Sequence, residues 1–157
     1  MKPNDIRVRP ATMADLDTIV RFNTQMALET EDKELPHQRS VSGVKSILED
    51  SAKGFYILAE CDDEVVGQIM INYEWSDWRN SFFWWIQSVY VLPNHRKIGA
   101  FRALFQHVER MAQNASNVFG FRLYVHKENH LAKKAYEGLG MEGSHYELYE
   151  KTLDQRE

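Results

Sequence analysis

Cysteine is almost absent from this chain. The only one, Cys61, has no second cysteine with which to form an internal disulfide, and no histidine stands beside it in the sequence. We interpret Cys61 as a packing residue at the end of a strand rather than as a nucleophile. Because a chain without disulfides is typical of a reducing compartment, we expect a cytoplasmic protein.

Long apolar segments are missing as well. The longest strand-like runs are interrupted by Gln, Asn or Gly, and none approaches the roughly 20 residues of a membrane-spanning helix. The first residues, Met-Lys-Pro-Asn-Asp-Ile-Arg, lack the apolar core of a signal peptide. The sequence therefore predicts no association with a membrane and no secretory leader.

Neither sign of charge is in large excess. Lys and Arg together number 19 and Asp and Glu 23, which gives a net charge of −4. A general nucleic-acid binder needs a basic face, so this balance argues against a nucleic-acid partner. The six histidines show no spacing typical of a zinc site, so we expect no metal.

The hydrophobic pattern predicts one domain over residues 1–157. With 157 residues and 43% hydrophobic composition, the chain can bury one substantial core. Strands are expected at residues 6–9, 55–61, 65–73, 83–91, 121–125 and 146–150, and a turn at 117–120. Helices are expected at 13–28, between Ser40 or Ser42 and Gly54, at 100–114, and from Asn129 to Gly140.

This order of elements predicts an α/β (α+β) fold. The sheet is expected to be mixed and mostly antiparallel, with about six to seven strands and about four helices on its two faces. Three strands follow one another without an intervening helix, so the fold is not a doubly wound nucleotide-binding sheet. The strand at 121–125 should run parallel to the strand at 83–91, because the helix between them makes a right-handed crossover.

The stretch from Ile86 to Leu104 carries the first chemical signal. A strand rich in β-branched residues ends at Pro93, and a turn with Arg96 and Lys97 closes on Gly99 before a helix begins. Unpaired N–H groups and the positive end of the helix dipole would stand beside two cations, which suits a phosphate or pyrophosphate. Many turns of this kind bind nothing, so the spacing alone leaves both interpretations open.

The same turn resembles a known family. Arg96-Lys97-Ile98-Gly99-Ala100-Phe101 is similar to the Arg/Gln-x-x-Gly-x-Gly/Ala pyrophosphate loop of the GNAT superfamily of N-acetyltransferases, which bind acetyl-CoA. Phe101 replaces the usual small residue, and we expect its ring to turn toward the core alongside Phe105. The resemblance implies that the cofactor pyrophosphate is held by Arg96, Lys97, Ile98, Gly99, Ala100, Phe101 and Arg102.

A second motif lies in the expected place further along the chain. Residues 128–141 resemble the Asn-x-x-Ala-x-x-x-Tyr-x-x-x-Gly-Phe segment of the same family, with Met141 in place of the Phe. The order of elements also resembles the family's order from end to end. The resemblance implies that Asn129 holds the pantetheine and that Tyr136 protonates the departing thiolate. A phenol with a pKa of about 10 can do so when it is well positioned.

The resemblance also implies a role for the central strand. In the family, the strands that match 83–91 and 121–125 splay apart, and the pantetheine bonds to the first of them. Backbone groups of Val89 and Val91 would take this role here. A strand N–H near Val89 would then stabilise the tetrahedral oxyanion.

The base that removes the proton of the amine is less evident. Many relatives with small amine substrates carry Glu at the position that matches Gln87, and Gln can only orient a water or the substrate. We favour Glu74, acting through water, as the base, with Asp77 as the next candidate. Three further acids follow them: Glu29, Glu31 and Glu150.

The leading hypothesis is therefore an acetyl-CoA-dependent N-acetyltransferase acting on a primary amine of a small molecule, such as a polyamine or an amino acid. A peptide or protein amine is the alternative acceptor. A catalytically silent acyl-CoA-binding or regulatory module is the alternative class, which Phe101 and Gln87 favour. The aromatic region 75–85 is open to three roles: core packing, the wall of a ligand site or a homodimer contact.

Overall fold

The computed structural model describes residues 5–154. The chain divides into two compact units, Met1–Tyr124 and Val125–Glu157. Within the described residues, the first unit holds the whole sheet and three of the four α-helices, and the second holds the fourth. Among the described residues, no helix combines the length and apolar character needed to cross a membrane.

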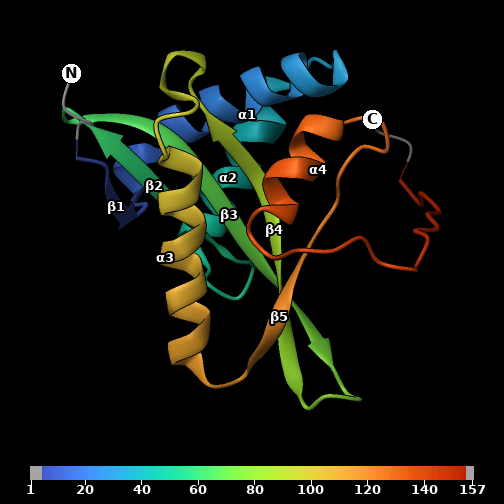
Figure 1. The fold of residues 1–157 in the computed structure, drawn as a ribbon. Coiled ribbons are helices and arrows are strands. Elements are labelled where there is room, and N and C mark those ends of the chain that lie inside the picture. The colour runs from blue at the N-terminus through green and yellow to red at the C-terminus, as the bar shows by residue number, and fades with distance from the viewer. Residues whose placement is uncertain (1–4, 155–157) are drawn as a thin grey trace. The chain divides into compact units, whose positions relative to one another are not determined.

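Five strands form one sheet in the first unit, in the order in which they occur in the sequence (Figure 1). They are β1 (Arg7–Pro10), β2 (Phe55–Cys61), β3 (Glu64–Ser76), β4 (Ser81–Val91) and β5 (Val118–Leu123). The first three junctions are antiparallel, and β4 pairs with β5 in parallel. The mixed, mostly antiparallel sheet and the parallel crossover are both as expected from the sequence.

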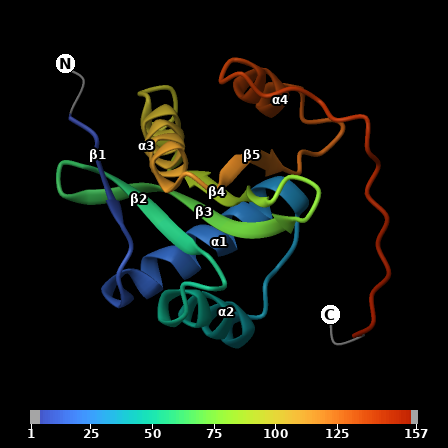
Figure 2. The ribbon, with the colours of Figure 1, turned by 90° about the horizontal axis from the view of Figure 1, so that it is seen from below.

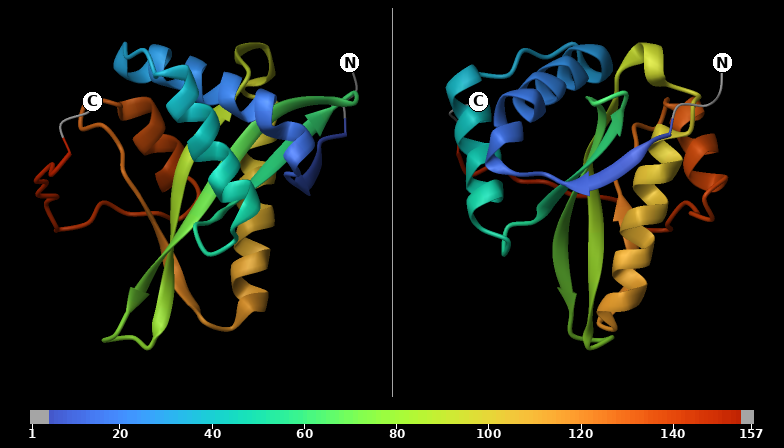
Figure 3. Two further views of the ribbon diagram at one scale, coloured as in Figure 1. Left: turned by 180° about the vertical axis from the view of Figure 1, so that it is seen from behind. Right: turned by 90° about the vertical axis from the view of Figure 1, so that its left-hand side faces the viewer.

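Helices cover both faces of this sheet, as the sequence predicts. A 3-10 turn at Met13–Asp15 leads into α1 (Leu16–Glu31), which is followed by α2 (His37–Glu49) and, after β4, by α3 (Ala100–Ala115). Seen from below, α1 and α2 lie on one face and α3 lies on the other (Figure 2). The right-hand view of Figure 3 shows the same arrangement, with α1 and α2 on one side of the sheet and α3 on the other.

The core forms because apolar residues alternate along the central strands. On the α1 and α2 face, Tyr56, Leu58 and Met70 pack with Ile19, Val20 and Val44 in one buried cluster. On the other face, a Cβ at Gly67 would stand 3.3 Å from the carbonyl oxygen of Tyr90 and 3.4 Å from Cδ1 of Leu104, so glycine relieves a tight contact between β3, β4 and α3. The β2–β3 turn at Asp62 and Asp63 has positive φ at both residues, as a tight hairpin requires.

The expected number of strands is wrong, because the described residues contain five rather than six to seven. The alternating segment 146–150 has no strand among the described residues. Alternation stabilises a strand only when one face is buried and a neighbouring strand accepts its hydrogen bonds. Here Tyr146 is 68% exposed and Tyr149 is 89% exposed, so no buried face forms.

The turn expected at 117–120 is also shorter in the structure. Ser116 ends α3 in a left-handed conformation, with φ of 61°, and reverses the chain at once. As a result β5 already begins at Val118.

The second unit contains α4 (His130–Glu137). Asn129 caps this helix as expected, because its Oδ1 accepts a hydrogen bond from the N–H of Ala132 at 3.1 Å. A turn follows the helix, and Gly140 takes a positive φ of 90° there. This conformation suits glycine and explains why the helix does not continue.

Candidate functional site

A bulge interrupts β4 near its carboxyl end. Gln87 lies opposite Met70 and Tyr90 opposite Gln68, so two β4 residues, Ser88 and Val89, stand against one residue of β3. Ser88 has a φ of 47°, a conformation that is uncommon for a residue with a side chain. A bulge of this kind bends a strand and redirects its backbone groups.

The bulge lies where β4 runs past its neighbour. β5 pairs with β4 only from Phe82 to Ile86, so in the first unit the last five residues of β4 have no strand partner on that side. The N–H of Leu92 donates to the carbonyl of Val66, toward β3. Because backbone groups alternate along a strand, those of Val89 and Val91 point away from β3. The two residues named from the sequence therefore lie on this free edge of β4.

The chain passes from this edge directly into the turn before α3. Gly99 is the N-cap residue of α3 with a φ of 92°, and a Cβ there would meet nothing within 4 Å. Glycine is thus required by the conformation rather than by space. No side chain caps the helix and its first turn holds no acid. The first turn of α3, with the N–H groups of Ala100 and Arg102 among its donors, therefore suits an anion.

Arg96 is held by three groups of the first unit. Its Nη2 donates to Oε2 of Glu29 at 2.6 Å, its Nε donates to the carbonyl of Val91 at 2.9 Å, and it lies over the ring of Tyr90. The hydroxyl of Tyr90 donates to the other oxygen of Glu29 at 2.8 Å. We call Glu29, Tyr90 and Arg96 the Arg96 cluster. No sequence pattern signals this cluster, because Glu29 and Arg96 lie 67 positions apart.

The Arg96 cluster shifts two proton equilibria. The hydrogen bond from Arg96 lowers the pKa of Glu29 below its ordinary value. Burial, followed by the hydrogen bond to the carboxylate of Glu29, raises the pKa of Tyr90. The carboxylate therefore stays ionised and the phenol stays protonated at neutral pH.

The ring of Phe101 lies beside Phe105, with the two centroids 6.4 Å apart, and Phe101 itself is half-buried. This agrees with the expectation that the side chain turns along the helix toward the core. The N–H of Phe101 stays in the first turn of α3. Lys97 and Arg102 are exposed on either side of it.

Glu74, the favoured base, is engaged in an ion pair. Its Oε2 accepts a hydrogen bond from Nη1 of Arg122 at 2.7 Å, and its Oε1 accepts one from Nε1 of Trp85 at 3.1 Å. Glu74 stands opposite Phe83, whereas Gln87 is four residues further along the same face of β4. At about 3.3 Å a residue, the two lie about 13 Å apart along the sheet. The structure thus places both on one face without bringing them together.

The other acids weighed from the sequence are spread over the surface. Asp77 lies in the exposed turn between β3 and β4, and Glu31 ends α1. Glu150 is exposed in the second unit. Of the acids considered, Glu29 contacts the bulged half of β4, where its Oε1 accepts a hydrogen bond from the hydroxyl of Tyr90. No group of three or more potential metal ligands occurs among residues 5–154.

The aromatic region 75–85 divides into two sets. Phe83 and Trp84 are each 7% exposed and belong to the core, as the commoner interpretation expects. By contrast, Trp75 is 52% exposed and Trp78 is 87% exposed. The indole of Trp85 lies 4.5 Å from the ring of Tyr124, beside the ion pair of Glu74. Core packing thus explains only part of this region.

The second motif lies entirely in the second unit. The side-chain oxygen of Asn129 caps α4, and Tyr136 stands near the end of the same helix. Burial raises the pKa of the Tyr136 phenol. At neutral pH this side chain is therefore protonated and can donate a proton.

The mixed sheet, the bulged edge of β4 and the basic turn before α3 together define an N-acetyltransferase fold. The profile of the acetyltransferase (GNAT) family matches residues 19–141. The chain therefore belongs to the GNAT acetyltransferase family and is an acyltransferase.

Solved structures agree with this assignment. A possible acetyltransferase from Clostridium difficile 630 is 47% identical, with a TM-score of 0.89 over 96% of this chain and 99% of that one. An aminoglycoside N-acetyltransferase in complex with CoA shares the fold at 16% identity and a TM-score of 0.77, over 96% and 97% of the two chains. A ribosomal-protein-alanine N-acetyltransferase from Brucella melitensis biovar Abortus 2308 does so at 16% and 0.76, over 96% and 100%. No curated protein matches the chain.

Proposed function

We propose that this protein transfers an acetyl group from acetyl-CoA to a primary amine of a small molecule, by direct attack of the amine on the thioester. The observation that carries this proposal is the continuity of two features. The free edge of β4 at Val89 and Val91 is joined to the uncapped N-terminus of α3 by the short connection at residues 92–99 alone. A strand edge suits an amide-containing arm and a helix N-terminus suits a pyrophosphate, which are the two parts of CoA.

In this proposal the cofactor is bound by two sets of groups. The pyrophosphate accepts hydrogen bonds from the first turn of α3, with Arg96 and Lys97 beside it. The pantetheine arm pairs with the backbone of Val89 and Val91, and Asn129 holds it from the second motif. The match of the family profile spans the boundary between the two units, which supports one acetyltransferase domain over residues 1–157.

The chemistry follows from the side chains assigned to it. The neutral amine attacks the thioester carbonyl, the new C–N bond forms, and the N–H of Val89 stabilises the oxyanion. When the C–S bond breaks, Tyr136 gives its proton to the thiolate. The proton lost by the amine passes first to a water oriented by Gln87 and then along a chain of waters to Glu74, because a single water cannot span the roughly 13 Å between the two residues. Because burial raises the pKa of Tyr136, its phenol is protonated at neutral pH, and the proposal assigns it the role of general acid.

Calorimetric titration with acetyl-CoA, followed by a screen for CoA thiol release with polyamines, amino acids and a lysine-containing peptide, tests this proposal. We expect micromolar binding of acetyl-CoA and thiol release with a small amine. Binding without thiol release for any amine would favour the silent acyl-CoA-binding module. Release with the peptide alone would instead assign a peptide or protein acceptor.

The Tyr136→Phe variant tests the acid within the same assay. Loss of a general acid typically costs about 100-fold or more in turnover, whereas affinity for CoA should stay within about threefold. Tyr146→Phe is the matched control, since Tyr146 is 68% exposed in the same unit, and it should behave as wild type. Unchanged turnover in Tyr136→Phe would refute the assigned role of this phenol.

A further inference from the structure

Three polar side chains gather in the interior beneath the bulge of β4. Gln68 of β3 is fully buried, Asn23 of α1 is 8% exposed and Tyr56 of β2 is 4% exposed. They lie on the face of the sheet that α1 and α2 cover, and Tyr56 belongs to the apolar cluster there. We call these three residues the Gln68 clamp.

The Gln68 clamp holds Ser88, the residue at the centre of the bulge. Nε2 of Gln68 donates to the carbonyl oxygen of Ser88 at 3.0 Å and to Oδ1 of Asn23 at 2.7 Å. Nδ2 of Asn23 donates in turn to the hydroxyl of Tyr56 at 3.3 Å. The hydroxyl of Tyr56 also hydrogen-bonds the side chain of Ser88. Both the carbonyl and the side chain of Ser88 are therefore fixed from inside.

This arrangement is not the one that core stability favours. Oε1 of Gln68 is buried and has no hydrogen-bond partner among the described residues. A buried polar atom without a partner costs stability, and an apolar side chain of similar length would avoid that cost. Ser88 also keeps a backbone conformation that persists only when its surroundings enforce it. The clamp therefore serves the geometry of the bulge.

The planar peptide bond carries this constraint to the free edge. The carbonyl of Ser88 and the N–H of Val89 belong to one peptide group, and in a trans peptide they point in opposite directions. When Gln68 holds the carbonyl of Ser88 inward, the N–H of Val89 has to point outward. This N–H is the group assigned above to the oxyanion.

We propose that Gln68 is a positioning residue for acyl transfer, which acts through the Ser88–Val89 peptide to aim the N–H of Val89 at the thioester oxygen. The inference rests on the proposed function and deepens it. Asn23 and Tyr56 assist by fixing the orientation of the Gln68 amide and of the Ser88 hydroxyl.

Gln68→Met tests the inference, because Met keeps the length of the side chain and removes the N–H donor. We expect kcat for amine acetylation to fall at least tenfold, since a misdirected oxyanion donor loses part of the 100-fold or more that such a group supplies. The dissociation constant for CoA should stay within about threefold. Hydrogen exchange at the Val89 amide, followed by NMR, should become faster. Ile57→Val, a change in the core at a residue of β2 outside the Gln68 clamp, is the control. It should change neither kcat nor the exchange rate of the Val89 amide.

Ser88→Gly in the Gln68→Met background separates positioning from stability. Glycine adopts the positive φ of Ser88 without strain, so it should restore whatever Tm the Gln68→Met change loses at Ser88, while kcat remains low. Recovery of kcat together with the Tm would overturn the positioning role. If Gln68→Met does not fold, Asn23→Ala serves instead, with about a threefold loss of kcat expected, and wild-type kcat in a folded Asn23→Ala would overturn the proposal.

The readouts also separate this inference from the proposed function. Unchanged exchange at the Val89 amide in Gln68→Met overturns the clamp, whatever the activity. Faster exchange with unchanged kcat overturns its part in catalysis. A wild-type protein that releases no thiol with any amine overturns the proposed function and with it the catalytic role of Gln68.

Discussion

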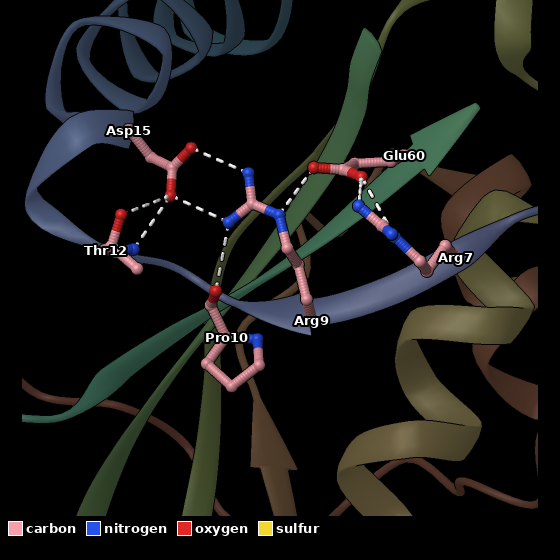
Figure 4. A network of polar contacts seen from close by, with 6 residues as sticks. All are labelled: Arg7, Arg9, Pro10, Thr12, Asp15 and Glu60. Carbon is pink, nitrogen blue, oxygen red and sulfur yellow. Dashed lines mark hydrogen bonds and ion pairs between the residues drawn. The ribbon is translucent and has the colours of Figure 1, made fainter. Parts of the chain in front are cut away.

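Two arginines of the first unit use the same chemistry for different ends. Arg9 of β1 donates to both oxygens of Asp15 at 2.9 Å and to Glu60 of β2, and Arg7 donates to Glu60 as well (Figure 4). Asp15 also accepts the N–H of Thr12 at 2.8 Å. We call these residues the Arg9 cluster.

The two clusters differ in how far they exclude water. In the Arg9 cluster the side chains of Arg9, Asp15 and Glu60 are 28%, 9% and 11% exposed. In the Arg96 cluster the side chains of Arg96 and Glu29 are 45% and 35% exposed. Here the carboxylate of Glu29 accepts a hydrogen bond from a single guanidinium nitrogen of Arg96.

The difference predicts that one arginine is structural and that the other can exchange its partner for a ligand. Removing one member of a nearly buried network leaves the other charges without partners, which is costly. An exposed ion pair contributes little, because water replaces either partner. In the proposed function a pyrophosphate would therefore displace Glu29 from Arg96 at small cost, whereas separating Arg9 from Asp15 and Glu60 would be costly.

Replacement of each arginine by Met tests the difference between the two clusters most directly. Arg9→Met should destabilise the protein by about 2 kcal/mol, because two nearly buried carboxylates lose a partner, and should lower the Tm by about 6 °C. Arg96→Met should leave the Tm within about 2 °C but weaken acetyl-CoA binding about 30-fold, since charge-assisted bonds to a phosphate are lost. Thermal unfolding and calorimetry measure the two effects.

Arg39→Met, at a position in α2 that belongs to neither cluster, is the control for both measurements. Arg9→Met should keep its affinity for acetyl-CoA at a temperature where the variant is folded, and a fall would contradict the assignment of Arg9 to structure alone. Wild-type affinity in Arg96→Met would contradict the assignment of Arg96 to cofactor binding.

The elements that the sequence predicted well depend on local signals. Pro93 and Gly99 mark the end of β4 and the start of α3, and Asn129 caps α4 within its own first turn. The hairpin at Asp62 and Asp63 needs only its own backbone conformation. Such signals act within a few residues, so a single sequence displays them.

The features that the sequence did not predict depend on distant partners. Ser88 is not a residue type that favours positive φ, and its bulge is held by Gln68 and Asn23, which are 20 and 65 positions away along the chain. The segment 146–150 shows the opposite case, because a strand is predicted there and the structure has none. Its alternation predicts a strand, yet the exposure of Tyr146 and Tyr149 shows that no buried face accompanies it. Neither outcome is decided by residues near in sequence.

Acid unfolding sharpens the comparison with a smaller effect. Hydrogen bonds from Arg9 lower the pKa of Asp15 and, together with those from Arg7, that of Glu60. A carboxylate whose folded pKa is lowered adds stability that is complete above its unfolded pKa, near 4, and is lost as the pH falls through the folded pKa. The difference in unfolding free energy between wild type and Arg9→Met, measured by urea unfolding, should therefore shrink by about 1 kcal/mol between pH 6 and about pH 2.5.

The same titration on Arg96→Met supplies the contrast. Arg96 lowers the pKa of Glu29 in the same direction, but this carboxylate is a third exposed and solvent screens its contribution. The difference between wild type and Arg96→Met should stay constant within error across this range. An acid-dependent difference as large as that of Arg9→Met would show that the Arg96 cluster is also structural.

Glu29→Gln gives the smallest expected effect and addresses the Arg96 cluster itself. Gln keeps the shape of the side chain but removes the charge that competes with the pyrophosphate for Arg96. Acetyl-CoA affinity should therefore rise about two- to fivefold, in proportion to the modest contribution of an exposed ion pair. The gain should shrink as salt is raised from about 20 mM to 500 mM, because screening weakens the competition in wild type. Glu31→Gln, two residues away at the end of α1, is the matched control and should not change affinity. A loss of affinity in Glu29→Gln would mean that Glu29 holds Arg96 in the orientation that binds the cofactor, and the two arginine clusters would then differ less than their exposure indicates.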